Sequence, residues 1–414
     1  MKLKLLSLFL LVTVAFASSA TAQSTWQEAA QHPSFGVERA FSFEIDGIVY
    51  VGGGRLASGF NLEEIWAYDI TTGDWIPKSN FPGTPRRNAF AFAANGYGYV
   101  GAGHDLDVAI GDFWRYDPAT DTWTQLDDFP GGVRSHAVGI SGDNKGYVSL
   151  GRTSDTDGYY NDFWEFDAAT ETWTELANFP SDGRWRAYGF FIDGKVYVGG
   201  GRLRPNDAFQ DLYAYDLTTG TWEEKTAAPT PRTLGAFSFV IQNKGFLIEG
   251  ATQTSGTLDY YGQGVFMYEP TTDTWIADDV AFIGEGRVLG VSEVVGNQAI
   301  LGTGRNYVNG MYYNDMYIFT PDLPTAIEEK ETANFNIYPN PIAGSQLFVQ
   351  GDFLNESETN CRIYDVNGSL VLFVTKNATG QNTISLDIKK LPKGIYQLEI
   401  INNERVNTQK FVKM

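Results

Sequence analysis

The sequence predicts an all-β protein with a repeated first part and a separate, smaller second β domain. Three observations support this prediction: a phrase that recurs about every 50 residues, a composition suited to strands and turns, and a change of pattern after residue 334. The chain has 414 residues, of which 45 are glycine, 14% are aromatic and 19% are charged. Such a mixture favours short strands and tight turns over helical bundles.

The repeated phrase is a strand carrying Tyr or Phe, then an acid, a short polar turn and a Trp. An apolar strand that ends in glycine precedes each copy. The phrase occurs five times with its tryptophan, at Trp75, Trp123, Trp173, Trp222 and Trp275. A sixth copy at 317–319 lacks the tryptophan, whereas Trp26 near the start has a similar setting with no strands before it. We therefore expect the segment around Trp26 to complete the last repeat.

Each repeat predicts a four-stranded sheet that is too small to bury its own faces, so the repeats must stack. Closing six sheets into a ring with the N-terminal strand also removes two exposed sheet edges. The sequence thus predicts a six-bladed β-propeller over residues 23–320. The paired glycines, the Tyr–Asp pair and the spaced tryptophan resemble kelch repeats, whose tryptophans pack between blades. A stacking platform for sugars is the alternative role for these tryptophans.

A second domain is predicted over residues 335–414, after a polar, proline-containing linker at 321–334. Its short strands and the hairpin turn at Asn367–Gly368 suggest a small Ig-like β-sandwich. The segment resembles the C-terminal sorting domain of type IX secretion in Bacteroidetes. The motifs that carry this resemblance lie at 338–341 (Tyr-Pro-Asn-Pro), 364–368 (Tyr-Asp-Val-Asn-Gly), 391–396 (Leu-Pro-Lys-Gly-Ile-Tyr) and 410–413 (Lys-Phe-Val-Lys). An ordinary adhesion module is the alternative.

Residues 1–22 have the pattern of a secretory signal peptide, with a basic start, an apolar run and an Ala-Thr-Ala cleavage site. The run is too short to cross a bilayer, and no later segment is apolar enough to do so. Together with the sorting-domain resemblance, this predicts export to the periplasm. The type IX secretion machinery would then recognise residues 335–414 and secrete the protein or attach it to the outer-membrane surface.

Charge and composition exclude several function classes. The 50 acidic and 30 basic residues leave a net charge of −20, which argues against nucleic-acid binding. The single cysteine, Cys361, excludes a disulfide framework, and three histidines offer little for a metal. Copper oxidases with kelch repeats need a cysteine in the propeller, and this propeller has none. No cofactor or metal is predicted, although 154–158 has the beginning of a calcium loop without its closing Glu.

The loops between the second and third strands of each blade, counted outward from the axis, form the candidate binding face. These loops are long, whereas the other turns are tight, and long loops on a rigid scaffold commonly carry function. They span 56–63, 105–111, 153–161, 203–210, 252–263 and 306–314. Aromatic residues are frequent in them, and Tyr160, Tyr261 and Tyr313 are candidate ligand contacts.

A first set of basic residues directly follows the glycine strands: Arg55, His104, Arg152, Arg202 and Arg305. An acid begins the third strand of the same blades, and the fifth blade lacks both groups. This joint absence favours structural ion pairs, because a lone buried charge would be costly. The predicted pairs are Arg55–Glu64, Arg152–Asp162, Arg202–Asp211 and Arg305–Asp315. A basic ring for an anionic ligand is the alternative.

A second set of arginines follows the connections between blades, each three residues before a small residue. Its members are Arg39, Arg86, Arg134, Arg186, Arg232 and Arg287. Since the innermost strands line the central channel, we expect these guanidinium groups near its mouth, where they could bind a carboxylate. Bonding to backbone carbonyls between blades is the alternative.

Two functions remain open at the level of sequence. The first is a secreted or surface-attached binding protein, not an enzyme, that recognises glycan or protein ligands through the long-loop face. The alternative is a sugar mutarotase or epimerase acting at the channel mouth, similar to the sialic-acid epimerases with kelch propellers. No particular acid–base pair can be assigned to it from the sequence.

Overall fold

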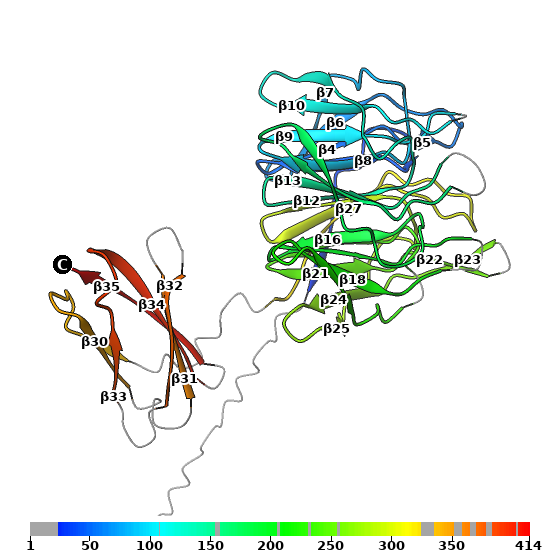
Figure 1. The fold of residues 1–414 in the computed structure, drawn as a ribbon. Coiled ribbons are helices and arrows are strands. Elements are labelled where there is room, and N and C mark those ends of the chain that lie inside the picture. The colour runs from blue at the N-terminus through cyan, green and yellow to red at the C-terminus, as the bar shows by residue number, and fades with distance from the viewer. Residues whose placement is uncertain are drawn as a thin grey trace, which may run out of the picture. The chain divides into compact units, whose positions relative to one another are not determined.

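The computed structural model describes residues 24–414 except 107, 154–157, 205–207, 231–232, 255–256, 324–334, 352–357, 365–369, 378–382 and 403–404. The chain divides into two compact units, Met1–Leu323 and Pro324–Met414 (Figure 1). Every regular element in the described ranges is a β-strand, as predicted. The predicted signal peptide and most of the predicted linker lie outside the described residues. No helix in those ranges is long and apolar enough to cross a membrane.

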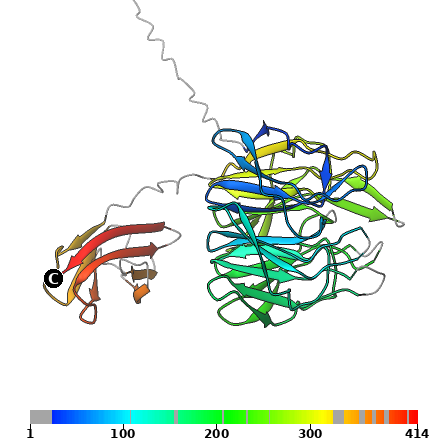
Figure 2. The same cartoon turned by 90° about the horizontal axis from the view of Figure 1, so that it is seen from above.

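The described part of the first unit contains six four-stranded antiparallel sheets, which we call the blades. Figure 2 shows the strands of this unit from above the view of Figure 1. Blades 1 to 3 contain β3 (Phe41–Ile45), β4 (Ile48–Gly52), β6 (Ile65–Asp69) and β7 (Asp74–Lys78); β8 (Phe90–Ala94), β9 (Tyr97–Gly101), β10 (Phe113–Asp117) and β11 (Thr122–Leu126); β12 (Val138–Gly142), β13 (Lys145–Ser149), β14 (Phe163–Asp167) and β15 (Thr172–Leu176).

Blades 4 to 6 contain β16 (Tyr188–Ile192), β17 (Lys195–Gly199), β18 (Leu212–Asp216) and β19 (Thr221–Lys225); β20 (Phe237–Ile241), β21 (Lys244–Ile248), β24 (Val265–Glu269) and β25 (Thr274–Ala277); β26 (Val291–Val295), β27 (Gln298–Gly302), β28 (Met316–Thr320) and β1 (Thr25–Ala29). Two short antiparallel pairs lie outside the blades: β2 (Val37–Glu38) with β5 (Arg55–Leu56), and β22 (Ala251–Thr254) with β23 (Thr257–Tyr261).

The sixth blade is built from both ends of the unit. Strand β1 pairs with β28 in a register that joins Thr25 to Thr320 and Ala29 to Met316. The innermost strands β3, β8, β12, β16, β20 and β26 contact one another in that order, and β26 contacts β3. The N-terminal strand therefore occupies the outer edge of the last sheet, where an edge would otherwise be open.

The repeated tryptophans lie on the outer strands and pack between neighbouring blades. The Trp123 ring packs edge-on against Phe81 at 5.1 Å between centroids, and its Nε1 donates a hydrogen bond to Ser79 O of the preceding blade at 3.2 Å. Trp222 and Trp275 donate equivalent bonds to the backbone carbonyls of Ala177 and Thr226. These residues are structural, in agreement with the kelch resemblance.

The second unit consists of two antiparallel sheets that share one apolar core. Their strands are β29 (Asn336–Tyr338), β30 (Gln346–Gln350) and β33 (Thr383–Asp387) in one sheet, and β32 (Leu370–Asn377), β31 (Glu358–Tyr364), β34 (Gly394–Asn402) and β35 (Arg405–Lys413) in the other. Leu347 and Leu386 from the first sheet pack in one cluster with Ile363, Leu398 and Ile400 from the second, all fully buried. This arrangement is a small β-sandwich.

Replacing Trp26 should destabilise the propeller, because its ring packs against Phe319 and Phe282 at 4.6 and 5.1 Å between centroids. Trp26→Ala should lower the free energy of unfolding by about 3 kcal/mol, as measured by urea denaturation. The control is Ile276→Ala on the outer strand β25, where the side chain is 50% exposed. Equal effects of the two substitutions would contradict a structural role for the β1 contact.

Candidate functional site

Five backbone hydrogen bonds link six aligned residues around the channel just before the innermost strands, and we call this arrangement the backbone ring. The six residues have φ between 56° and 63°, namely Arg39, Asn88, His136, Arg186, Gly235 and Leu289. The amide of Asn88 donates to Arg39 O at 3.0 Å, His136 to Asn88 O at 3.0 Å, and Arg39 to Leu289 O at 2.7 Å. Residues other than glycine rarely adopt this left-handed backbone conformation. The ring therefore fixes the backbone at Arg39 and Arg186.

The residue before each ring position pairs with the residue that follows the glycine strand of the same blade. The pairs are Glu38–Arg55, Arg87–His104, Ser135–Arg152, Trp185–Arg202, Leu234–Ala251 and Val288–Arg305. This pairing gathers seven arginines at one end of the channel, which we call the basic mouth: Arg39, Arg55, Arg87, Arg152, Arg186, Arg202 and Arg305. Burial lowers the pKa of Arg87 most, and the nearby charges of Arg39 and Arg55 lower it further. The charges of the basic mouth are therefore close enough to affect one another.

One side of the basic mouth has a buried counter-ion. Glu38 has no exposed surface, and its carboxylate lies 3.4 Å from Arg39 Nε and 3.8 Å from Arg305 Nη1. The Tyr307 hydroxyl donates to Glu38 Oε2 at 2.6 Å and accepts a bond from Arg39 Nη2 at 2.6 Å. Because Glu38 is covered, it orients Arg39 and Tyr307 and does not itself face the solvent.

The other side of the basic mouth is centred on Trp185, which is 6% exposed. Three guanidinium carbons lie over its ring, at 3.9 Å for Arg152, 4.4 Å for Arg186 and 4.2 Å for Arg202. His136 packs edge-on against the same ring at 4.7 Å. We call Trp185, Arg152, Arg186 and Arg202 the Trp185 cluster.

Several donors of Trp185, Arg186 and Arg202 lack acceptors among the described residues. Trp185 Nε1, Arg186 Nε, and Arg202 Nε and Nη1 are buried without a hydrogen-bond partner in the structure. Burial, together with nearby arginines, lowers the pKa of Arg186 to about 9 and that of Arg202 to about 10. The same causes hold the pKa of His136 well below 6.5, so this histidine is neutral at pH 7. The cluster thus concentrates positive charge with unused donors.

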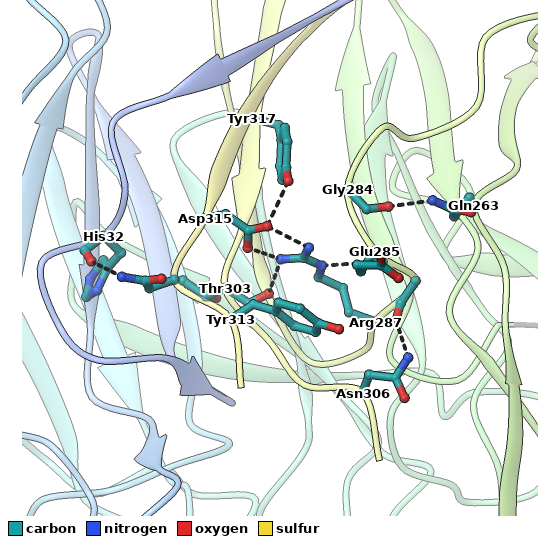
Figure 3. A network of polar contacts seen from close by, with 12 residues as sticks. His32, Gln263, Gly284, Glu285, Arg287, Thr303, Asn306, Tyr313, Asp315 and Tyr317 are labelled. Carbon is teal, nitrogen blue, oxygen red and sulfur yellow. Dashed lines mark hydrogen bonds and ion pairs between the residues drawn. The ribbon is translucent and has the colours of Figure 1, made fainter. Parts of the chain in front are cut away.

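The prediction that Arg86, Arg134 and Arg287 line the channel mouth was wrong. Their side chains are at most 1% exposed and form ion pairs with Asp112, Asp162 and Asp315. Arg134 binds both oxygens of Asp162 at 2.6 Å, and Arg287 also donates to Glu285 O at 2.8 Å and Thr303 O at 3.3 Å (Figure 3). These arginines lie two residues before the ring residues Asn88, His136 and Leu289, whereas Arg39 and Arg186 are ring residues themselves. The predicted set of six arginines therefore combined two different structural positions.

The predicted pairs Arg55–Glu64, Arg152–Asp162, Arg202–Asp211 and Arg305–Asp315 were also wrong. Three of these acids bind the arginines of the blade connections, with Arg184 on Asp211 at 2.6 Å. Glu64 instead accepts bonds from Ser34 Oγ at 2.9 Å and Trp66 Nε1 at 3.3 Å. The four arginines of the predicted pairs therefore belong to the basic mouth.

The three candidate tyrosines have different positions. Tyr160 and Tyr313 lie over the buried guanidinium groups of Arg134 and Arg287, at 3.8 and 3.9 Å, and so cover structural ion pairs. Figure 3 shows the Tyr313 ring beside Arg287. The Tyr261 hydroxyl accepts a bond from the Tyr307 amide at 2.8 Å and supports the basic mouth. The remaining candidate, Arg232, lies outside the described residues.

Sequence patterns did not single out Glu38, Arg87 or Trp185. Each directly precedes a ring residue with positive φ. Aligning the six repeats on these ring residues would therefore have placed Glu38, Arg87 and Trp185 at one equivalent position. Below the mouth, the channel is lined by small side chains of the innermost strands, such as Ser42, Ala91 and Gly139. It contains a cavity of about 220 Å³ there and one of about 400 Å³ toward the opposite face.

The wider cavity is bordered by three acids, Glu44, Asp143 and Glu293. Burial raises the pKa of Glu293 to about 7, and Ser42 Oγ donates to its carboxylate at 2.6 Å. Among the described residues, no group of three or more His, Cys, Asp or Glu side chains could hold a metal ion.

These features define a kelch-repeat β-propeller joined to a secretion sorting domain. The model of the KLHDC2/KLHL20/DRC7 Kelch-repeats domain matches residues 14–188, and that of the Kelch motif matches 190–226. The secretion system C-terminal sorting domain matches residues 336–414. The chain is therefore a kelch-repeat protein with a type IX secretion C-terminal sorting domain, which indicates secretion or attachment to the outer-membrane surface.

A solved structure entitled "Structure of YjhT" is similar with a TM-score of 0.62 and 18% identity, covering 72% of this chain and 98% of that one. At this identity the likeness concerns the fold alone. A comparison with curated protein sequences gave no significant match.

Breaking one buried ion pair should destabilise the propeller strongly. Asp112→Asn leaves the Arg86 charge, which is fully buried, without its counter-ion and should lower the free energy of unfolding by about 3–5 kcal/mol in urea denaturation at pH 7. The control is Arg202→Gln in the basic mouth, where relief of like-charge repulsion should leave stability unchanged or raise it by up to about 1 kcal/mol. A larger loss for Arg202→Gln would contradict this assignment.

The stability lost in Asp112→Asn should also depend on pH. Burial raises the pKa of Asp112, but bonding to Arg86 and its charge outweigh burial and hold that pKa below 3.8. A lowered carboxyl pKa gives stability that is present above the unfolded-state pKa and lost as pH falls through the folded-state pKa. The stability difference between the native protein and Asp112→Asn should therefore narrow only below about pH 3.8.

Proposed function

We propose that the propeller is a binding module for an anionic extracellular ligand, a glycan or an acidic group on a protein, held at the basic mouth. The observation that carries the proposal is the charge imbalance of the mouth. Arg55, Arg186 and Arg202 have no carboxylate within 4 Å among the described residues. They stand in a chain whose net charge is −20. Lowered pKa values and focused positive charge are features of binding and catalytic sites.

Preorganisation supports binding at this place. The backbone ring holds Arg39 and Arg186, Glu38 orients Arg39, and stacking on Trp185 restricts Arg152 and Arg202. A ligand would therefore pay little to order these side chains. Guanidinium forks match planar carboxylates and tetrahedral oxyanions, and their interactions strengthen where water is partly excluded. The sorting domain supports a ligand outside the cell.

Titration calorimetry on the full chain tests the proposal. Oligosaccharides of uronic acids should bind more tightly than neutral oligosaccharides of equal length, and the affinity should fall as salt increases. Arg186→Gln should weaken binding about ten- to a hundredfold, since a hydrogen bond to a charged group is lost. The matched control is Arg115→Gln on β10, whose side chain pairs with Glu171 away from the mouth, and it should bind normally. Equal binding of neutral and acidic sugars would contradict the proposal.

A sugar mutarotase or epimerase is the second candidate, favoured by the position of Tyr307. Its hydroxyl is held between Arg39 Nη2 and Glu38 Oε2, each at 2.6 Å, and could donate or accept a proton at a bound sugar. Glu38 is covered, so Tyr307 would be the group that touches the substrate and Glu38 the group that positions it.

Anomer exchange of sialic and uronic acids, followed by time-resolved NMR, separates this candidate from simple binding. If the propeller is an enzyme, exchange should exceed the buffer rate, and Tyr307→Phe should reduce it at least about a hundredfold. The affinity of Tyr307→Phe for the sugar should change much less, because the arginines remain. Exchange at the buffer rate with the native protein would exclude the mutarotase and leave the binding function in place.

A further inference from the structure

The positive charge of the basic mouth is unevenly compensated. On the side formed by blades 6 and 1, Arg39 and Arg305 share the carboxylate of Glu38. On the side formed by blades 3 and 4, the side chains of Arg186 and Arg202 make no hydrogen bond or ion pair with the part of the chain that the structure describes. An anion would therefore gain most at the Trp185 cluster.

The unused donors of this cluster do not lie in one plane. The guanidinium groups of Arg186 and Arg202, which hold buried nitrogens without acceptors, lie over one indole ring, and the buried Nε1 of that indole lacks an acceptor as well. A carboxylate presents two oxygens in a plane and suits one guanidinium fork. The three terminal oxygens of a phosphate or sulfate ester point in different directions and can accept bonds from several donors at once.

We propose that the Trp185 cluster is a subsite for a tetrahedral oxyanion, the phosphate or sulfate ester group of a modified saccharide. The inference rests on the proposed function and names the chemical class of its ligand. The ester group lies against Arg186, Arg202 and Trp185 Nε1. The sugar ring extends toward the compensated side, where the hydroxyl groups of Tyr307 and Tyr312 offer neutral hydrogen bonds.

The position of the subsite agrees with the burial of its members. Arg186 is 7% exposed and Trp185 is 6% exposed, so the oxyanion would be largely withdrawn from water. Withdrawal strengthens charge-assisted hydrogen bonds and makes the match between donors and acceptors decisive. A neutral sugar would leave the same donors unpaired and would bind poorly.

Calorimetry with four monosaccharides tests the subsite on the full chain: glucose 6-phosphate, glucose 6-sulfate, glucuronate and glucose. At least one ester should bind about tenfold or more tightly than glucuronate, and the tighter of the two identifies the ester type. If neither ester binds more tightly than glucuronate while glucuronate binds, the subsite is wrong and the proposed function stands. If none of the four sugars and no uronic-acid oligosaccharide binds, both are wrong.

Variants locate the ester group. Arg202→Gln and Trp185→Phe should each weaken ester binding about tenfold or more, whereas Arg305→Gln, beside Glu38, should weaken it less than about threefold. Thermal denaturation checks that each variant is folded, and Trp185→Phe keeps an aromatic ring at this position while it removes the Nε1 donor. The phosphorus resonance of glucose 6-phosphate should shift on binding to the native protein, and at least about tenfold more Arg202→Gln protein should be needed for the same shift. Equal losses for Arg202→Gln and Arg305→Gln would overturn the assignment.

Discussion

The buried ion pair between the connection that enters a blade and the third strand of that blade is the interaction on which the rest of the propeller depends. In four blades an arginine of the connection forms an ion pair with an aspartate, as Arg134 does with Asp162. The arginine also donates hydrogen bonds to backbone carbonyls, for example from Arg134 to Leu150 O. The pair ties the connection to the sheet and is covered by aromatic side chains such as Tyr160 and Phe209. Because breaking such a pair leaves a buried charge alone, the connection is held in one conformation.

That fixed connection explains the backbone ring that follows it. Two residues after each of these paired arginines, the chain adopts a positive φ. The backbone amides at these positions form hydrogen bonds from blade to blade around the channel. Adopting this conformation is costly for Arg39, Asn88, His136, Arg186 and Leu289. The surrounding contacts offset the cost and aim Arg39 and Arg186 at the channel mouth. Stability and site geometry thus come from one repeated device.

Two groups of arginines in the propeller differ in how their charge is compensated. The structural arginines are neutralised by aspartates and are no longer available to a ligand. Glu38 lies within 4 Å of Arg39 and Arg305, whereas Arg186 and Arg202 have no carboxylate that close among the described residues. Burial, and then neighbouring arginines, lower the pKa of Arg87, Arg186 and Arg202. Such unfavourable crowding is typical of sites that keep function at the expense of stability. A secretion sorting domain on the same chain is consistent with a ligand met outside the cell.

The all-β architecture, the repeats, the closing N-terminal strand and the sorting domain follow from the sequence, because they depend on periodic patterns and on turn residues that local physics constrains. The partners of the arginines do not follow from it. Arg184 and Arg186 are two residues apart and look equivalent in a linear pattern. In the structure, however, Arg184 forms a buried ion pair with Asp211, whereas Arg186 stacks on Trp185. Only the tertiary structure decides this, since the turn at positive φ, and not the spacing to the next small residue, determines which side chain faces the channel.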